Sequence, residues 1–420
     1  MIRHLPVVQN WDCHVSGCCC KEYQVTLTDE ERRRIEAQGW DSQTDLGGLP
    51  PFIKSGPWWK RRYQLTGRGD GSCVFLSDQG RCRIHERFGY EAKPLPCRLF
   101  PFVLVPVADH WRVGLRFACP SAAANKGRPL PEHDDALKDF AAELAVREGL
   151  QAAHAGAIVR APALQGRQRV EWPDLLRFVQ ALQTILNTRR DRLERRVRKW
   201  LALANLCRQA RFDEVTGGRL VEFLNLLAAS VEAETPANPK ALKPPSWIGR
   251  LLFRQALALF TRKDQGPNRG SATGSRLALL AAASRFALGR GTVPRLHAWL
   301  PETTFERIEA ATGSLPEEAE QILERYYAIK LGSIQFCGSA YFGLSFWDGL
   351  EALCLTFPVI LWTARSFADL PRTEAVLRAL SIVDDHFGFN RMLATQRQRL
   401  STRFLVRLHE LEKLIAWYSR

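Results

Sequence analysis

Eight cysteines lie within the first 119 residues of this 420-residue chain, and their thiols are the side chains best suited to chemistry. They are Cys13, Cys18, Cys19, Cys20, Cys73, Cys82, Cys97 and Cys119. Thiolates bind zinc in sets of four, and they also hold iron–sulfur clusters, usually in fours. The eight thiols therefore predict one or two metal sites, and their spacing leaves both zinc and iron–sulfur open.

The run Cys18 to Cys20 cannot face one metal from an extended strand, because successive side chains of a strand point to opposite faces. Gly17 permits a turn there, since glycine tolerates positive φ. Either a curled loop wraps one centre, or neighbouring thiols serve different centres. Three later cysteines, Cys207, Cys337 and Cys354, each stand alone in a helical pattern and are interpreted as small core side chains.

Two histidines and two arginines lie close to these cysteines in the sequence. His14 and His85 could complete a metal site, since imidazole is a zinc ligand, and a surface position is the alternative for both. Arg83 and Arg98 adjoin cysteines and could offset thiolate charge. An ordinary solvated arginine is the alternative there.

Short strands, turns and one clear helix must position the thiols. Residues 28–31 read Thr-Asp-Glu-Glu, which is the spacing of a capping box and predicts a helix to about residue 38. The Gly- and Pro-rich residues 41–57 predict a loop. Two hairpins are expected beyond it. The first joins strands 58–65 and 73–76, and the second joins strands 99–107 and 111–117.

From residue 131 the apolar period changes from two to 3.6, which predicts helices and a domain boundary. The expected fold is α+β: a small irregular cysteine-rich module with short β-hairpins, residues 1–121, then a mostly α-helical domain, residues 132–420. Proline- and glycine-containing breaks near 234–246 and 264–275 predict flexible linkers. A capping-box spacing recurs at residues 314–317, and residues 391–418 suggest one amphipathic stripe.

Composition and charge narrow the class of protein. A hydrophobic content of 46% is typical of a folded chain. The N-terminus has no apolar run of a secretory signal, so we expect a cytoplasmic protein with reduced thiols. The apolar residues 352–364 are shorter than the roughly 20 residues of a membrane helix, so we expect a buried helix and no membrane span.

A formal net charge of +15 would suit an acidic partner. Much of the excess is arginine spread over helices, so we do not expect a nucleic-acid partner. The basic face at residues 189–199 would be the surface to test for one.

The order of the cysteine motifs resembles a known family. The motifs are Cys13, Cys19-Cys20, Cys73-Val-Phe-Leu76, Gly80-Arg-Cys82-Arg-Ile-His85, Lys93-Pro94, Cys97-Arg98-Leu-Phe100-Pro101-Phe102 and Cys119-Pro120. They resemble, over residues 11–121, the bacterial cysteine-cluster family of zinc- or iron-chelating domains, which includes the flagellin lysine N-methylases. The family pattern has a cysteine where this chain has Ser16. Cys18 could substitute for it, or the site lacks that ligand.

The long helical part is similar in architecture to the flagellin methylase branch. This resemblance implies an iron–sulfur protein that transfers a methyl group from S-adenosylmethionine to a lysine of a protein such as flagellin. The residues themselves offer no glycine-rich strand-to-helix turn for an adenosyl cofactor. Two functions therefore stand side by side: a protein lysine N-methyltransferase, and a non-catalytic metal-stabilised or metal-handling protein whose helical domain docks a partner.

Overall fold

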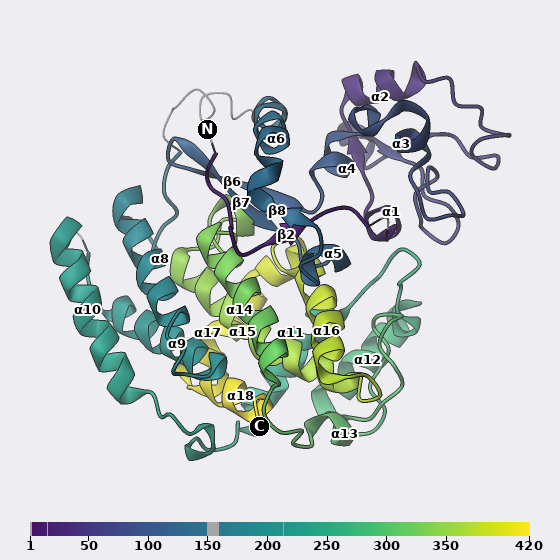
Figure 1. The fold of residues 1–420 in the computed structure, drawn as a ribbon. Helices are drawn as coiled ribbons and strands as arrows, with labels where there is room; N and C mark the ends of the chain where they lie inside the picture. Colours follow the sequence, from purple (N-terminus) through teal and green to yellow (C-terminus); the bar gives the residue numbers. More distant parts are fainter. Residues whose placement is uncertain (1, 15, 149–158, 213) are drawn as a thin grey trace.

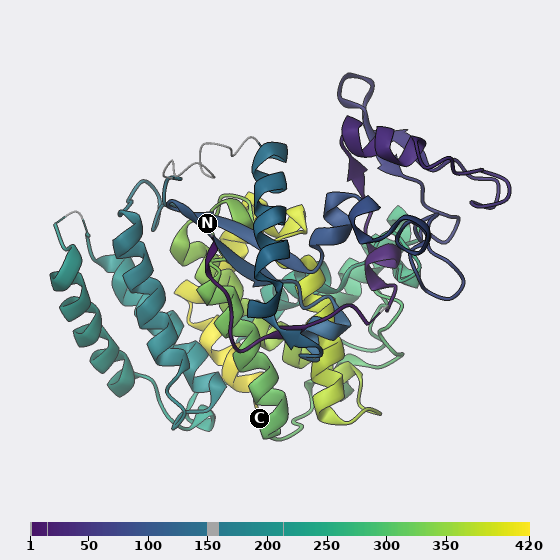
Figure 2. The ribbon, with the colours of Figure 1, turned by 45° about the horizontal axis from the view of Figure 1, so that its top comes forward.

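The protein consists of a helical body and a smaller lobe that projects from one edge of it (Figures 1 and 2). The lobe comprises residues 18–99. The structure is a computed structural model and describes residues 2–14, 16–148, 159–212 and 214–420. Small sheets occupy residues 2–129, and the described residues after 130 are largely helical. This arrangement confirms the predicted α+β class.

Three small sheets organise the N-terminal part. The strands are β1 (Ile2–His4), β2 (Asn10–Trp11), β3 (Thr26–Leu27), β4 (Phe52–Ser55), β5 (Arg62–Leu65), β6 (Phe102–Val107), β7 (His110–Leu115) and β8 (Arg128–Pro129). β6 and β7 form an antiparallel hairpin, as predicted, with β1 parallel to β7. β5 lies between β3 and β4, and β2 pairs with β8.

Short helices separate these strands, and longer ones build the body. The N-terminal helices are α1 (Cys18–Glu22), α2 (Asp29–Glu36), α3 (Arg83–Phe88), α4 (Leu95–Leu99), α5 (Pro120–Ala123) and α6 (Asp134–Arg147). The body contains α8 (Trp172–Leu186), α9 (Leu193–Gln209), α10 (Gly217–Glu234), α11 (Trp247–Thr261), α12 (Arg276–Leu288), α13 (Phe305–Glu309), α14 (Glu317–Gly332), α15 (Phe346–Ser366), α16 (Arg372–His386), α17 (Gln396–Arg407) and α18 (Glu410–Tyr418).

Two hydrophobic cores of unequal size hold the chain together. The main core joins the β6–β7 hairpin and α5 to the helices of the body. The lobe has a separate core of seven buried side chains: Leu27, Ile35, Leu46, Leu65, Val74, Phe75 and Ile84. A core this small is seldom enough for a stable unit, and natural domains of this kind usually add metals or disulfides.

Helix α15 runs through the centre of the body. By length and composition it is the one helix of the described ranges that could cross a membrane. Inside the protein, however, 89% of its most apolar stretch of 18 residues is buried. The burial predicted for residues 352–364 is therefore confirmed. Such burial is expected of a core helix, whose neighbours here include α9, α16 and α18.

Several local predictions were wrong. Residues 41–57 contain β4, and β5 pairs with β3 and β4 instead of with residues 73–76, which form turns. The predicted capping box at residues 314–317 is absent, because Pro316 takes the N-cap position of α14. The predicted C-terminal stripe is broken at His409, whose φ of 55° separates α17 from α18.

Candidate metal centre

The run of three cysteines forms the start of a short helix. Gly17, with φ of 64°, is the N-cap of α1, and its carbonyl accepts hydrogen bonds from the amides of Cys20 and Lys21. A helix turns about 100° per residue, so consecutive thiols point in different directions. The buried Cys18 thiol lies 3.6 Å from the carbonyl oxygen of Ala118, whereas Cys19 and Cys20 lie on the other side, with their sulfurs 4.0 Å apart.

Five of the eight predicted thiols line one cavity of about 250 Å³. They are Cys19, Cys20, Cys73, Cys82 and Cys97. They come from four places in the chain: α1, the turn at residue 73, the N-cap of α3, and α4. The last three of these thiols also pack against the small core of the lobe. The cavity therefore lies where the elements of the lobe meet.

Backbone hydrogen bonds and prolines fix these thiols in place. The Cys73 amide donates to the Cys20 carbonyl at 2.7 Å, which ties the turn at residue 73 to α1. Pro94 and Pro96 begin α4, so the segment around Cys97 is a short helix. Proline suits the first turn of a helix, because the amide hydrogens there have no intrahelical partner.

The thiols that line the cavity do not ionise together readily. Burial raises the pKa of Cys73 to about 12 and also raises that of Cys97. A contact with Cys20, assisted by Lys93, lowers the pKa of Cys19 to about 6, and the same contact raises that of Cys20. Several thiolates in one buried space repel one another. A metal ion or cluster would supply the positive charge that holds them deprotonated.

Two cations that the sequence did not predict to lie beside the thiols line the cavity: Lys93 and Arg116. Both are about 90% buried. Lys93 could have been suspected from its place four residues before Cys97. Arg116 could not, because only the end of β7 brings it to the lobe.

The arginines predicted to offset thiolate charge lie elsewhere. Arg83 donates to the carbonyl of Asp45, and Arg98 pairs with Glu91 and Glu143. Arg98 therefore links α4 to the neighbouring α6.

The remaining predicted ligands do not line this cavity. Cys13 is exposed, and the buried Cys119 is the N-cap of α5. His14 turns its Nδ1 toward the Asp12 carbonyl and the Ser121 hydroxyl, and His85 packs edge-on against Tyr90. The metal-binding role of these groups stays a prediction.

The distances between the metal-binding side chains bear on the kind of metal centre that they could hold. Across the described ranges, no three His, Cys, Asp or Glu side chains lie close enough together to hold one metal ion. A tetrahedral zinc site requires four donors within about 2.0–2.3 Å of one point. In an iron–sulfur cluster the thiolates attach to different iron atoms, so they surround a larger volume. As arranged, the five thiols line a common cavity without three of them meeting at one point.

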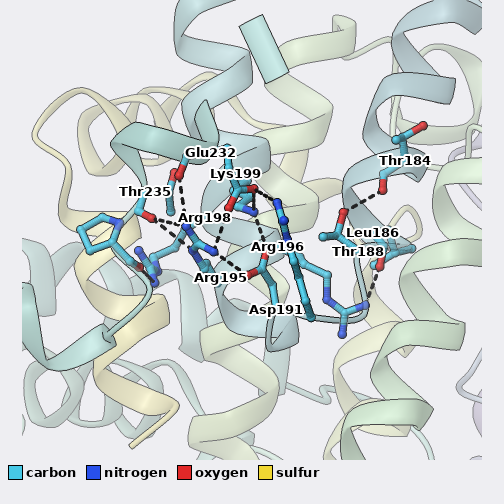
Figure 3. A network of polar contacts seen from close by, with 12 residues as sticks. Thr184, Leu186, Thr188, Asp191, Arg195, Arg196, Arg198, Lys199, Glu232 and Thr235 are labelled. Carbon is cyan, nitrogen blue, oxygen red and sulfur yellow. Dashed lines mark hydrogen bonds and ion pairs between the residues drawn. The ribbon is translucent and has the colours of Figure 1, made fainter. Parts of the chain in front are cut away.

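Four cations of the basic face at residues 189–199 are occupied by ion pairs, whereas Arg189, Arg190 and Arg192 are exposed. Figure 3 shows Arg195 and Lys199 sharing Asp191 and Glu232. Arg196 pairs with Glu324 and Arg198 with Glu194, and these four cations are largely buried. They stabilise the packing of α9 and are not available as a solvated surface for phosphates.

Residues 12–122 match one family model, CxxCxxCC, described as a "putative zinc- or iron-chelating domain". No curated protein and no solved structure matches the chain. The match contains all eight cysteines discussed above and ends before the helical body. Over residues 12–122 the chain is thus similar to a cysteine-cluster domain described as zinc- or iron-chelating.

Proposed function

We propose that the protein is a cysteine-cluster metalloprotein whose cavity holds an iron–sulfur cluster. The observation that carries this proposal is that five thiols from four separate places in the chain line one cavity of about 250 Å³. Four of Cys19, Cys20, Cys73, Cys82 and Cys97 would be the ligands. When bound, such a cluster supplies iron-based redox or Lewis-acid chemistry.

The residues around the thiols support this assignment. Four thiolates bring negative charge into a buried space, and Lys93 and Arg116 place two cations beside it. Aromatic and aliphatic side chains such as Phe75, Ile84 and Phe100 form much of the remaining lining. Hydrogen bonding, burial and nearby charge are the means by which a protein tunes such a cluster.

A bound cluster would also stabilise the lobe. Its ligands would join α1, α3, α4 and the turn at residue 73, and α1 and α4 contribute none of the seven buried side chains of the small core. Metal binding and folding then share one free energy, because the unfolded chain offers no preformed site. Reduced thiols and oxygen-sensitive iron suit the cytoplasm, which we propose as the compartment.

Anaerobic purification followed by iron, sulfide and zinc analysis tests the proposal. We expect iron and sulfide in stoichiometric amounts with broad visible absorption. Cys73→Ala/Cys97→Ala, which leaves three of the five thiols, should abolish both. Cys207→Ala, which removes a buried thiol from α9, is the matched control and should retain them. Stoichiometric zinc without sulfide would replace the cluster with a structural zinc site, and a metal-free folded protein would refute both.

A lysine N-methyltransferase that uses S-adenosylmethionine, with flagellin as a possible substrate, is the second candidate. One feature favours it: a mostly apolar cavity of about 590 Å³ lies between the cysteine loop, α5 and α16, lined in part by His14, Ser16, Trp299 and Ser381. Cavities that bind small molecules usually measure about 300–1,000 Å³, so this one has room for a nucleoside cofactor.

Titration calorimetry with S-adenosylmethionine tests this second candidate on the metal-loaded protein. Ser381→Trp would fill the cavity and should abolish binding, while the metal content stays unchanged. Mass spectrometry of flagellin after incubation with cofactor would then reveal methylated lysine. If no cofactor binds to a protein that retains its metal, the methyltransferase proposal fails. The alternative function is then that of a non-catalytic, metal-stabilised protein whose helical body docks a partner.

A further inference from the structure

The hairpin β4–β5 ends in a tip that exposes two adjacent tryptophans. Trp58 is 79% exposed and Trp59 71%, and both belong to a single turn of 3₁₀-helix, Trp58–Lys60. Side chains of this size are normally buried, and such exposure means that they protrude from the surface. We call residues 54–62 the Trp tip.

The backbone of the Trp tip is a well-defined turn. Gly56 has φ of 98°, and a Cβ atom there would lie 2.9 Å from the carbonyl oxygen of Lys60. The Lys60 amide in turn donates to the Pro57 carbonyl at 2.9 Å. Glycine is therefore required at residue 56, and the turn holds the two tryptophans in a fixed place at the end of the hairpin.

The Trp tip carries positive charge that nothing nearby offsets. Lys54, Lys60, Arg61 and Arg62 are all exposed, and the described residues place no acidic side chain in ion-pair contact with them. The sequence contains no Asp or Glu from residue 46 to residue 69. The cations Arg195, Arg196, Arg198 and Lys199 of α9, by contrast, are paired inside the fold. The tip thus combines exposed tryptophan with free cations.

We propose that the Trp tip docks on the surface of an anionic lipid bilayer. Tryptophan prefers the boundary between headgroups and acyl chains, and Lys and Arg bind anionic headgroups. The tip lies on the lobe, which stands out from the helical body (Figure 2), so a flat surface can reach it. The contact would be peripheral, with the chain lying on the membrane.

The geometry of the tryptophans favours a bilayer over single-stranded nucleic acid. The two rings are perpendicular, with an interplanar angle of 90° and centroids 5.6 Å apart. Successive bases stack on aromatic faces along a charged groove, and two perpendicular rings in contact cannot both offer a face to parallel bases. A membrane interface imposes no such alignment on the rings.

Sedimentation of the full-length, metal-loaded protein with vesicles tests this proposal. Vesicles of phosphatidylcholine with 30% phosphatidylserine are compared with vesicles of phosphatidylcholine alone. We expect binding to the anionic vesicles only. It should weaken as salt rises, because the attraction falls off within a Debye length.

Two variants probe the two halves of the tip. Trp58→Ala/Trp59→Ala should weaken binding about 10-fold or more, since it removes the inserted apolar surface. Lys60→Gln/Arg61→Gln/Arg62→Gln should weaken it about 5-fold for each cation removed. The second variant keeps both tryptophans and tests the proposal even if the first fails to fold.

The matched control is Leu277→Ala/Leu280→Ala, which removes apolar side chains that are 79% and 65% exposed on α12. It should bind as the unchanged protein does. Equal binding to both kinds of vesicle, or equal losses in the control and tip variants, would overturn the proposal. So would tighter binding of the tip to a single-stranded oligonucleotide than to anionic vesicles.

Discussion

Asp385, near the end of α16, connects the lobe to the helical body. It accepts hydrogen bonds from the Tyr23 hydroxyl at 2.7 Å, from Arg116 at 2.9 Å and from Lys263 at 2.6 Å. The guanidinium of Arg116 also stacks on the rings of Tyr23 and Phe389. Burial alone would raise the pKa of Asp385, but Lys263 and Arg116 outweigh burial and lower it. The carboxylate is therefore ionised at neutral pH.

Replacing Asp385 with asparagine keeps the shape of the side chain and removes its charge. The side chains of Arg116 and Lys263 are only 10% and 11% exposed, so the replacement would remove from both buried cations the carboxylate that they share. Leaving a buried ion pair without one partner costs about 3–5 kcal/mol. We expect Asp385→Asn to lower the free energy of unfolding by that amount at pH 7.

Urea unfolding followed by circular dichroism measures this loss. Hydrogen exchange should locate it, with faster exchange in β3 and at the end of β7. Asp135→Asn is the control, because Asp135 forms an exposed ion pair with Lys138 and should leave stability unchanged. A loss below about 1 kcal/mol in Asp385→Asn would show that water already solvates these cations. The argument that Asp385 neutralises buried cations between the lobe and the body would then fail.

Three further predictions concern buried titratable groups and a helix cap. Burial lowers the pKa of His386 to about 4, so between pH 6.5 and 4 the unfolded state binds more protons, and stability falls as the pH falls. His386 should contribute about 1.4 kcal/mol per pH unit to this loss. His386→Asn should remove that share in urea unfolding at several pH values, while His4 and His297, whose pKa values burial also lowers, retain theirs. Thr28→Ala removes the capping box with Glu31 and should cost about 1 kcal/mol, measured by faster exchange of α2 amides. Lys330→Met leaves the buried Asp384 unpaired and should cost about 3–5 kcal/mol by calorimetry, with partial recovery on adding Asp384→Asn.

Local signals in the sequence predicted local structure well. The Thr28 capping box formed as expected, with both reciprocal hydrogen bonds in place. The β6–β7 hairpin and the helices after residue 131 followed from their periods of two and 3.6. At residues 314–317 the same spacing failed, because Pro316 fixes an extended backbone before α14 and no side-chain cap forms.

What the sequence could not predict depended on contacts between distant segments. The sequence predicted that residues 58–65 pair with residues 73–76, whereas β5 pairs with β3 and β4. The cysteine motifs predicted a metal site but not which thiols share a cavity. Cys18 and Cys119 belong to the same motifs as the five thiols that line the cavity, and nothing in the sequence sets them apart. Arg116 reaches the cavity through β7, and no pattern near it indicates that place.

The separate core of the lobe has a thermodynamic consequence. Because its seven apolar residues are distinct from the main core, the lobe can unfold while the body and the β6–β7 hairpin remain folded. The cavity thiols and the Trp tip both belong to this one unit. A ligand that binds only the folded lobe at one of these two sites therefore favours binding at the other site. Metal binding and membrane docking would strengthen each other by the same factor.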